Sequence, residues 1–547
     1  MLWRTTKDRE PMNELKPLPL GNSSFPRIRV TDQIYVDKTR LIFDLASKAE
    51  KFFLARPRRF GKSLLISTFE SLFKYGLRDF QGLEIEKLWK EKNTFNVVRI
   101  DFLEIKNYLS ADDFSSKLDS LLVRRFQEFG FVYAPNPLSS PIDQISDWLR
   151  RQPVNSFVIL IDEYDSPLTA CLNDKKLFEK VRSRLAEFYS ALKSNDEQIR
   201  FLFITGITKF SKTSIFSELN NLSDISLDHK YSNLLGYTSE EIRSYFGGYL
   251  RRAADTVQIS PQELFLGLIK HYDGFCFDRL VSEHVFAPWS VLKFLSSPEN
   301  GFIDYWFESG GKPTALTQYF KSHAMADPAQ FDKEKLVPFS ELTGSSDAET
   351  LSDVALLTQA GYLTLKKIVG STAYVGYPNV EVKKAMALLY TGQLLSSKTV
   401  EQVGADNIAY RLSTENPESI VHLLNCLFRS IDYQRYPVKD EYSLRAFVQV
   451  FFAGAGLEAR AEVHNHLGRS DLEVKAGSRY WVMEFKCAER AENVSRKLEE
   501  AVSQLNEKNY GLQRRDAEII RLALVFSLEK REFVKWKSLE DFEKTAD

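Results

Sequence analysis

The stretch KFFLARPRRFGKSLLISTFESLFKYG, residues 51–76, decides the fold of the first part of the chain. Its first five residues, KFFLA (51–55), form a short apolar run that is typical of a buried strand. The basic turn that follows ends in GKS (61–63), the last three positions of a phosphate-binding loop. Apolar residues then recur at helical spacing, at Leu64, Leu65, Phe69, Leu72 and Phe73. Strand, loop and helix in this order predict a P-loop nucleotide site.

Arg56 stands where such a loop normally has its first glycine, and Pro57 follows it. Glycine adopts backbone angles that arginine does not adopt readily, and proline has no N–H to offer a phosphate. We therefore expect a loop of different curvature. Two roles remain open for Arg58 and Arg59: they bring positive charge to the phosphates, or they face solvent or a partner.

More apolar runs follow, separated by helical patterns. They are NVVRIDF (96–102), SFVILIDEYD (156–165) and IRFLFITGI (199–207). Continuous apolar strands alternating with helices predict an α/β domain with a parallel sheet covered on both faces.

Asp162 and Glu163 directly follow the apolar run VILI (158–161). The carboxyl ends of strands are where open α/β sheets bind ligands. We therefore expect Asp162 to hold Mg²⁺ and Glu163 to activate the attacking water. The alternative is a strand that simply exits into a polar loop.

The candidate ATP site is completed by the loop itself. Lys62 is expected to reach the β- and γ-phosphates, and Ser63 to hold Mg²⁺. The backbone N–H groups of Gly61, Lys62 and Ser63 point from a helix start toward an anion. The remaining candidate nucleotide-binding residues are Arg59, Phe60 and Leu64.

The rest of the chain has two different patterns. Residues 246–400 are mostly helical, with a helix and a small hairpin near their end, which suggests a helical lid with a winged-helix-like element. From about residue 401 to 547 helices and strands mix again. We therefore predict three domains, 1–245, 246–400 and 401–547.

A second set of acidic and lysine residues lies in the last domain, in GRSDLEV (468–474) and WVMEFK (481–486). Glu484 and Lys486 are two apart on one strand and therefore leave the same face. With Asp471 they form the set that a metal-dependent nuclease needs, in which Asp471 and Glu484 hold Mg²⁺ and Lys486 orients water or neutralises charge. The alternative is an exposed strand with an ordinary Glu/Lys pair.

Three nearby residues are weaker candidates. Glu441 begins the preceding helix and either adds a carboxylate to the site or only faces the helix dipole. His464 and His466 alternate along a strand without further ligand-spaced partners, so we expect hairpin surface rather than metal ligands.

The composition narrows the class of protein but does not identify its function. The chain has 547 residues, and 73 Lys and Arg against 74 Asp and Glu give a net charge of −1, which neither indicates nor excludes nucleic acid. Four widely spaced cysteines without a CxxC pair form no zinc pattern and no disulfide framework. No stretch approaches the ~18 apolar residues of a membrane span. We expect a soluble, cytoplasmic protein without a membrane partner.

Several motifs together resemble the AAA-ATPase-like proteins that carry a C-terminal PD-(D/E)XK nuclease-like domain. They are YVDKTRLI (35–42), FLARPRRFGKSLL (53–65), VILIDEYDSPL (158–168), ITGITKFSKTSIFSELNNLSDIS (204–226), LLGYTSEEI (234–242), GRSD (468–471) and EFK (484–486). An arginine-rich approach to GKS is usual in that family, so the resemblance implies a family variant of the loop rather than a broken one.

The resemblance also implies roles for single residues. Thr205 or Thr208 would sit in the sensor position near the γ-phosphate, unless these hydroxyls only cap backbone. Lys209 and Lys212 would contact phosphate or DNA, or be solvated. Asp37 and Lys38 would frame the adenine. Gln504 and Tyr510 match positions in the helix after the nuclease core, where they support the site or only pack.

We therefore expect an ATP-binding and ATP-hydrolysing protein that couples nucleotide turnover to Mg²⁺-dependent cleavage of DNA phosphodiester bonds. The alternative is a nucleotide-dependent switch whose nuclease-like domain recognises DNA or protein without cutting. The sequence leaves the oligomeric state open, a homo-oligomer included.

Overall fold

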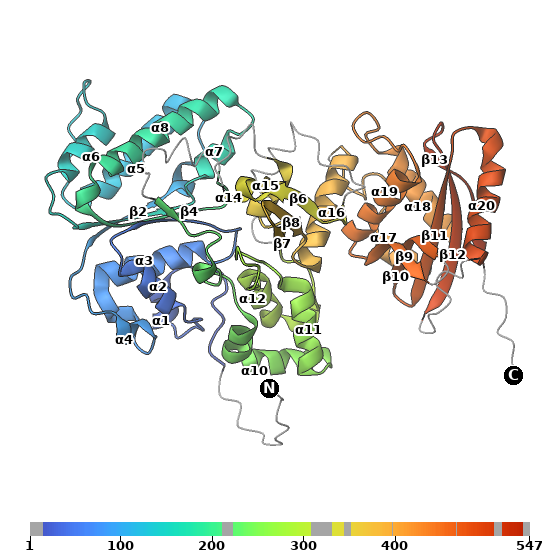
Figure 1. Cartoon of the computed structure of the whole chain (residues 1–547), viewed down its shortest axis with the longest axis horizontal. Coiled ribbons are helices and arrows are strands. Elements are labelled where there is room, and N and C mark those ends of the chain that lie inside the picture. The colour runs from blue at the N-terminus through green and yellow to red at the C-terminus, as the bar shows by residue number, and fades with distance from the viewer. Residues whose placement is uncertain are drawn as a thin grey trace, which may run out of the picture. The chain divides into compact units, whose positions relative to one another are not determined.

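The computed structural model describes residues 15–209, 222–307, 331–343, 352–396, 398–465, 468–507 and 517–539. Two compact units make up the chain (Figure 1). The first comprises residues 1–322 and 334–381, and the second comprises residues 323–333 and 382–547. The chain therefore changes units at 381/382, inside the segment that the sequence assigned to a middle domain.

A parallel five-stranded sheet organises the first unit, in the order β2-β3-β4-β1-β5. The strands are β1 (Lys51–Ala55), β2 (Asn96–Asp101), β3 (Phe157–Asp162), β4 (Ile199–Gly206) and β5 (Leu222–Asp224). Strand β3 is buried along its whole length, because helices cover both faces of the sheet. The predicted parallel α/β fold is confirmed.

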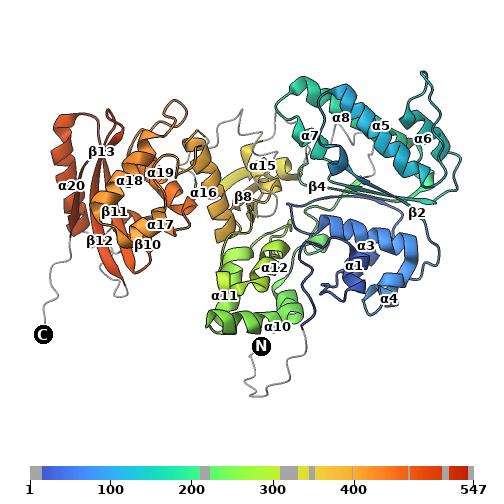
Figure 2. The ribbon, with the colours of Figure 1, turned by 180° about the vertical axis from the view of Figure 1, so that it is seen from behind.

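Helices form one layer on each side of this sheet (Figures 1 and 2). One layer contains α1 (Phe25–Val30), α2 (Thr39–Ala46), α3 (Lys62–Tyr75) and α4 (Ile85–Leu88). The other contains α5 (Ala111–Gln127), α6 (Pro141–Leu149), α7 (Ser166–Ala170) and α8 (Lys175–Ser194). Short 3₁₀ turns connect several elements, at Gly76–Asp79, Phe102–Ile105, Asp196–Gln198, His229–Tyr231 and Pro298–Asn300.

Three helices follow the sheet in sequence and build a separate core with the segment that precedes β1. They are α10 (Ser239–Val257), α11 (Pro261–Tyr272) and α12 (Pro288–Ser296). Capping boxes fix the starts of α10 and α11, at Thr238 and Ser260. Ile34 and Val36 are buried in the same apolar cluster as these helices.

A three-stranded antiparallel sheet in the order β6-β8-β7 completes the first unit. Its elements are β6 (Lys335–Pro338), α14 (Phe339–Thr343), α15 (Asp353–Gln359), β7 (Thr364–Val369) and β8 (Thr372–Gly376). The helix and hairpin expected near the end of the middle region are thus present as α15 and β7–β8.

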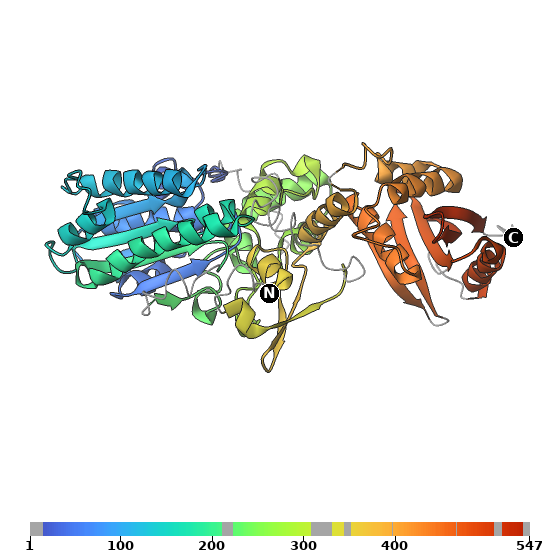
Figure 3. The ribbon, with the colours of Figure 1, turned by 90° about the horizontal axis from the view of Figure 1, so that it is seen from above.

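The second unit is built on a mixed five-stranded sheet in the order β13-β12-β11-β10-β9. Figure 3 shows its strands, orange to red, flanked by helices. The strands are β9 (Ala459–Asn465), β10 (Gly468–Ala476), β11 (Arg479–Ala488), β12 (Glu518–Ser527) and β13 (Glu532–Leu539). The helices are α16 (Val380–Leu394), α17 (Ile408–Thr414), α18 (Pro417–Arg429), α19 (Glu441–Gly454) and α20 (Val494–Glu507), with a 3₁₀ turn at Ala491–Asn493.

Helix α20 packs on β11 and β12 around Tyr480, Val482 and Ala523. Helices α18 and α19 also contact the sheet; Phe428 of α18 packs on Phe526 of β12 and stacks on Phe447 of α19. Within the part of the chain that the structure describes, no helix is both long and apolar enough to cross a bilayer.

Candidate functional site

Arg56 is a buried structural residue and does not line the pocket that opens at the start of α3. Its side chain is 1% exposed, and its guanidinium donates hydrogen bonds to the carbonyl oxygens of Ala55, Ser226 and Tyr231. It also lies 4.2 Å from the centre of the Phe277 ring. In place of the first loop glycine, the chain therefore has a side chain that ties the end of β1 to residues 226–231.

The rest of the loop turns into α3 at the GKS tripeptide. Gly61 is the N-cap of α3 with a φ of 102°, a left-handed conformation that favours glycine, and Arg59 has a φ of 66°. The Lys62 ammonium donates to the carbonyl oxygens of Arg56 (3.1 Å) and Pro57 (3.2 Å). It lies 3.3 Å from Glu163 Oε1. Lys62 thus stands between the loop carbonyls and the acidic end of β3.

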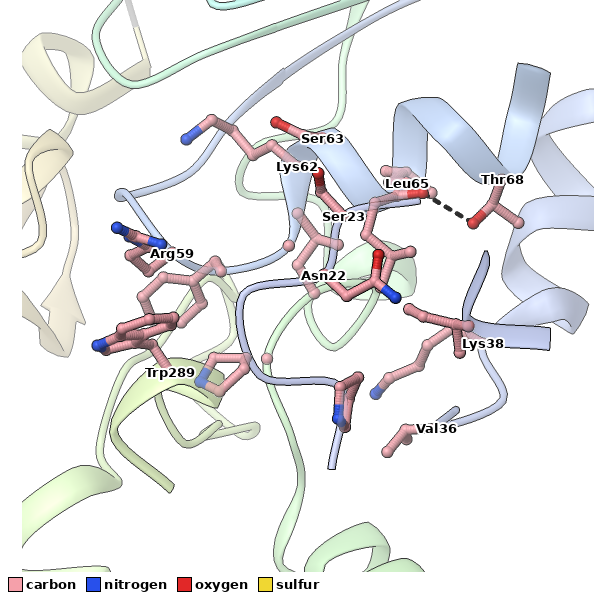
Figure 4. Close-up of a pocket in the computed structure, with 18 of the residues that line it drawn as sticks. Asn22, Ser23, Val36, Lys38, Arg59, Lys62, Ser63, Leu65, Thr68 and Trp289 are labelled. Atoms are coloured by element: carbon pink, nitrogen blue, oxygen red, sulfur yellow. Dashed lines mark hydrogen bonds between the residues drawn. The ribbon is translucent and has the colours of Figure 1, made fainter. Parts of the chain in front are cut away.

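A pocket of about 590 Å³ opens at the start of α3 (Figure 4). The predicted residues Arg59, Phe60, Gly61, Lys62, Ser63, Leu64 and Glu163 all line it, and so does Arg58. Its other walls come from the segment before α1, from Ile34, Val36 and Lys38, from Leu235 to Tyr237, and from α12. Asp162 and Thr205 are not among the lining residues.

The two acidic residues at the end of β3 have different surroundings. Asp162 is buried, and its Oδ1 accepts a hydrogen bond of 2.6 Å from Thr205 Oγ1. Glu163 lies beside Lys62 with a φ of 52°. Burial raises the pKa of Glu163, and the Lys62 ammonium offsets part of that rise. Glu163 is therefore the carboxylate that faces the pocket, and Thr205 orients Asp162.

Asp165, which sequence reasoning missed, anchors the loop after β4. Its carboxylate accepts from the backbone N–H groups of Ile207 and Thr208, and at 2.6 Å from Thr208 Oγ1. The signal was present in the sequence as a third acidic residue in IDEYD (161–165). Both candidate sensor threonines thus bind a carboxylate at the carboxyl end of β3.

Three other predicted residues make internal contacts. Lys209 Nζ pairs with Asp224 Oδ2 at 2.9 Å and is 4% exposed. Lys38 lines the pocket and pairs with Glu241 of α10 at 2.5 Å. Asp37 caps the start of α2 by accepting from Thr39 N and Oγ1. Lys212 lies outside the described residues.

Trp289 of α12 forms the pocket wall opposite the GKS turn, and no sequence pattern pointed to it. The Arg59 side chain lies over its ring (Figure 4), with the guanidinium 4.3 Å from the ring centre. Trp289 Nε1 is buried and has no acceptor among the described residues. One arginine of the basic turn is therefore stacked on a pocket-lining tryptophan while it remains exposed to solvent.

In the second unit, neighbouring strands bring the predicted nuclease residues together. Asp471 lies on β10, and its Oδ2 accepts a 2.9 Å hydrogen bond from the backbone N–H of Phe485 on β11. Glu484 Oε1 accepts from Lys486 Nζ at 3.0 Å. Glu484 Oε2 is buried and has no hydrogen-bond donor among the described residues. Because an unpaired buried carboxylate oxygen is costly, this atom is suited to take a metal ion or a water as its partner.

The electrostatics of this group follow from burial and from like charge. Burial, with the nearby Asp471 carboxylate, raises the pKa of Glu484 to about 7. Burial also raises the pKa of Asp471. Burial alone would lower the pKa of Lys486, but the carboxylates of Glu484, Glu441 and Asp471 outweigh it and raise the pKa. The cluster therefore has an excess of acidic groups over cations.

Helix α19 adds two side chains to this cluster. Glu441 Oε1 accepts from the backbone N–H of Cys487, the residue after Lys486, at 3.2 Å. Arg445, one turn later, donates from Nη1 to Glu462 Oε1 at 3.0 Å, and the same atom lies 4.0 Å from Asp471 Oδ1. A pocket of about 350 Å³ opens beside Glu441 and Cys487. The sequence pointed to Glu441 but not to Arg445, which shares its helix face.

Asp471 and Glu484 are suited to hold Mg²⁺. Over the described ranges, no three His, Cys, Asp or Glu side chains come close enough to enclose a metal ion. Mg²⁺ commonly uses only one or two carboxylates and keeps several waters. The acidic excess and the unpaired Glu484 Oε2 fit such an ion. Tyr510 and His466 fall outside the described residues, as does the His464 side chain, and Gln504 Oε1 on α20 is buried without a donor among the described residues.

Comparisons with known proteins match both units. A family model described as "Predicted AAA-ATPase" matches residues 19–216, and one for the PD-(D/E)XK nuclease superfamily matches residues 439–536. An uncharacterised protein in the vnfD 5′ region of Azotobacter chroococcum mcd 1 is 31% identical over 536 residues, which cover 95% of this chain and 98% of that protein.

Among solved structures, the Aeropyrum pernix ORC2 protein in its ADPNP and ADP complexes aligns with a TM-score of 0.27 and 13% identity. The alignment covers 83% of this chain and 91% of that one. From the two family models and the full-length relative, the chain belongs to the AAA-ATPase-like proteins whose C-terminal domain is of the PD-(D/E)XK nuclease superfamily.

Proposed function

We propose that the chain binds and hydrolyses ATP in its first unit and cleaves DNA phosphodiester bonds with Mg²⁺ in its second. The observation that carries the second activity is the buried Glu484–Lys486 pair beside Asp471, with one Glu484 oxygen left unpaired. A domain that only recognises DNA has no need to bury a lysine and a glutamate beside a half-buried aspartate. We also propose the domain limits 1–245, 246–400 and 401–547.

At the ATP site, the Lys62 ammonium changes its hydrogen-bond and ion-pair partners when ATP binds. Its ammonium exchanges two loop carbonyls and Glu163 for phosphate oxygens, while the N–H groups at the start of α3 bind the same anion. Glu163, released from Lys62, accepts a proton from the attacking water, a role that its raised pKa favours. Asp162 and Ser63 would hold the Mg²⁺ that accompanies ATP.

The ATP proposal is tested by titration calorimetry and phosphate release. We expect Lys62→Ala to lose ATP binding, and Glu163→Gln to bind ATP but hydrolyse it about 10²–10⁴-fold more slowly, as expected for a lost general base. Lys74→Ala, at the other end of α3 and outside the pocket, is the matched control. Equal ATP affinity in wild type and Lys62→Ala would contradict the proposed site.

At the second site, Asp471 and Glu484 would hold Mg²⁺, which when bound polarises the phosphodiester and neutralises its charge. Lys486, held by Glu484, is placed to orient the attacking water and to stabilise negative charge as it develops. The carboxylates of Glu484, Glu441 and Asp471 together outweigh burial and keep Lys486 protonated. The proposed substrate is DNA, whose structure and sequence the site does not specify.

The nuclease proposal is tested by incubating the full chain with Mg²⁺ and single-stranded, duplex and branched DNA, with and without ATP. We expect cleavage that falls about 100-fold or more in Lys486→Ala and in Glu484→Ala. It should persist in Lys537→Ala, an exposed lysine of β13. DNA binding without cleavage in any condition would favour the alternative, a nucleotide-dependent switch that recognises DNA without cutting.

A further inference from the structure

Arg445 is an unusual neighbour for a metal-binding carboxylate. Its side chain is 6% exposed, and it faces the cluster from α19, four residues after Glu441. Nη1 is hydrogen-bonded to Glu462 Oε1 at 3.0 Å but is 4.0 Å from Asp471 Oδ1, beyond hydrogen-bond distance. Arg445 Nε is buried and has no acceptor among the described residues. The guanidinium therefore lies at ion-pair distance from Asp471 without a hydrogen bond to it.

Glu462 is the group that holds it there. Arginine and carboxylate usually pair through two parallel hydrogen bonds, and such a pair would occupy both oxygens of Asp471. One of them, Oδ2, already accepts from the Phe485 N–H. Nη1 is hydrogen-bonded to Glu462 and not to Oδ1, and the guanidinium also lies 4.8 Å from the centre of the Tyr442 ring. Glu462 itself is reached from the solvent side by Arg469, whose Nη1 lies 3.5 Å from Glu462 Oε1.

We propose that the Arg445–Glu462 pair is a positioning device that keeps Asp471 Oδ1 open to a divalent cation and sets how tightly that cation binds. Arg445 places a buried positive charge next to the ligand and so weakens metal binding, while Glu462 restrains Arg445 and so strengthens it. This inference rests on the proposed metal site, and neither residue is itself a ligand or a catalytic group.

The two single substitutions therefore have opposite effects. Arg445→Met removes a charge that repels the cation across a poorly solvated distance, so we expect Mg²⁺ affinity to rise about tenfold or more. Glu462→Gln frees Arg445 to pair with Asp471, so we expect affinity to fall about tenfold. A side chain that only supported the fold would lower metal affinity in both variants.

Arg469→Met is the matched control, because Arg469 approaches the same Glu462 but is 58% exposed. Solvent and salt screen its charge, so we expect less than about a threefold change. The double variant Arg445→Met with Glu462→Gln lacks the charge that Glu462 restrains, so it should bind Mg²⁺ about as tightly as Arg445→Met alone. Its departure from the product of the two single effects gives the coupling between the two residues directly.

The experiment is calorimetric titration of the full chain with Mg²⁺, repeated with Mn²⁺, in the absence of nucleotide, with Asp471→Ala to define binding at this site. Opposite shifts for Arg445→Met and Glu462→Gln support the proposal. Shifts of the same sign, or an Arg469→Met effect as large as that of Arg445→Met, overturn it. Identical isotherms for wild type and Asp471→Ala would overturn the proposed metal site as well, so the two failures are distinguishable.

Discussion

At the scale of single residues, Arg56 belongs to the loop before α3, but its charged side chain is buried in the fold and does not line the pocket. Three backbone carbonyls and the Phe277 ring surround its guanidinium, and burial lowers its pKa. These carbonyls belong to the end of β1 and to the chain after β5. Arg56 therefore fixes the start of the loop. Lys62, at the other end of the loop, donates hydrogen bonds to the carbonyl oxygens of Arg56 and Pro57.

Arg56→Lys should destabilise the first unit, because a single ammonium cannot reach all three carbonyls. Buried carbonyls left without donors cost about 2–4 kcal/mol in total, which lowers the melting temperature of a unit of this size by roughly 3–5 °C. Differential scanning calorimetry of the full chain measures this. Arg58→Lys, which changes a pocket-lining arginine, is the control and should melt within about 2 °C of wild type. A stable Arg56→Lys protein would contradict this role.

The sequence predicted residues of the two candidate sites from two different patterns, and it missed at least one residue of each. Gly61, Lys62 and Ser63 were identifiable because their spacing is fixed by the turn from a strand into a helix. Asp471, Glu484 and Lys486 were identifiable because alternate residues of a strand share a face. Arg445 and Trp289 were not, because they reach their sites from helices whose orientation depends on tertiary packing.

At the scale of elements, α10 shows how the segment before α1 is attached. The helix has two adjacent glycines in its interior, Gly247 and Gly248, although glycine weakens a helix. A Cβ on Gly247 would meet nothing within 4 Å, whereas one on Gly248 would clash with Leu15 Cδ2. Residues 15–19 are also held by Tyr249, whose hydroxyl donates to Lys16 O. Gly248 is thus a docking point for a segment whose Pro19 lines the nucleotide pocket.

Gly247→Ala and Gly248→Ala make a matched pair that separates helix propensity from docking. We expect Gly247→Ala to stabilise the first unit by about 0.5–1 kcal/mol. Gly248→Ala gains the same propensity but displaces Leu15, so the stabilisation should disappear and ATP affinity should fall a few-fold. Calorimetric melting and ATP titration measure both. Equal stabilisation and unchanged ATP affinity in the two variants would show that Leu15 docking does not matter to the pocket.

Helices and strands could be predicted from the sequence wherever the periodic pattern of apolar residues was long. The apolar runs that became β1 to β4 and the amphipathic stretch of α19 need no knowledge of their neighbours. Strands β5 and β6 were missed, because three- and four-residue strands carry too few alternations to stand out. They exist because a neighbouring strand supplies their hydrogen bonds, β1 for β5 and β8 for β6.

At the scale of the whole molecule, Glu381 marks the point where one compact unit ends and the other begins. It is fully buried at the start of α16, and the helix continues into the second unit from Val382. Its carboxylate accepts from Ser290 Oγ at 2.9 Å and from the Tyr305 N–H at 2.7 Å. Ser290 follows Trp289 of the nucleotide pocket on α12. A buried acid therefore fixes the end of the first unit to the helix that forms the pocket wall.

The protonation of Glu381 makes the stability of the first unit depend on pH. Burial raises its pKa from 4.5 to about 8, and the nearby Asp304 acts in the same direction. Between these values the folded chain holds a proton that the unfolded chain releases, so stability falls as pH rises through this window and levels off above it. The Gln side chain of Glu381→Gln resembles the protonated acid. The wild-type protein should lose several kcal/mol of unfolding free energy between pH 5 and pH 8 because of Glu381, and the variant should not show this loss.

Melting of the full chain at pH 5, 6, 7 and 8 tests this prediction. Other buried carboxyls with raised pKa values, Glu163 among them, also make the wild-type protein less stable as pH rises. The quantity to compare is therefore the difference in stability between wild type and variant at each pH. Glu381→Gln should flatten the profile of the transition that belongs to the first unit, whereas Glu240→Gln, an exposed residue of α10, should leave it parallel to wild type. Parallel profiles for Glu381→Gln and wild type would mean that Glu381 stays ionised in the folded chain, and a cation would then have to lie close to it.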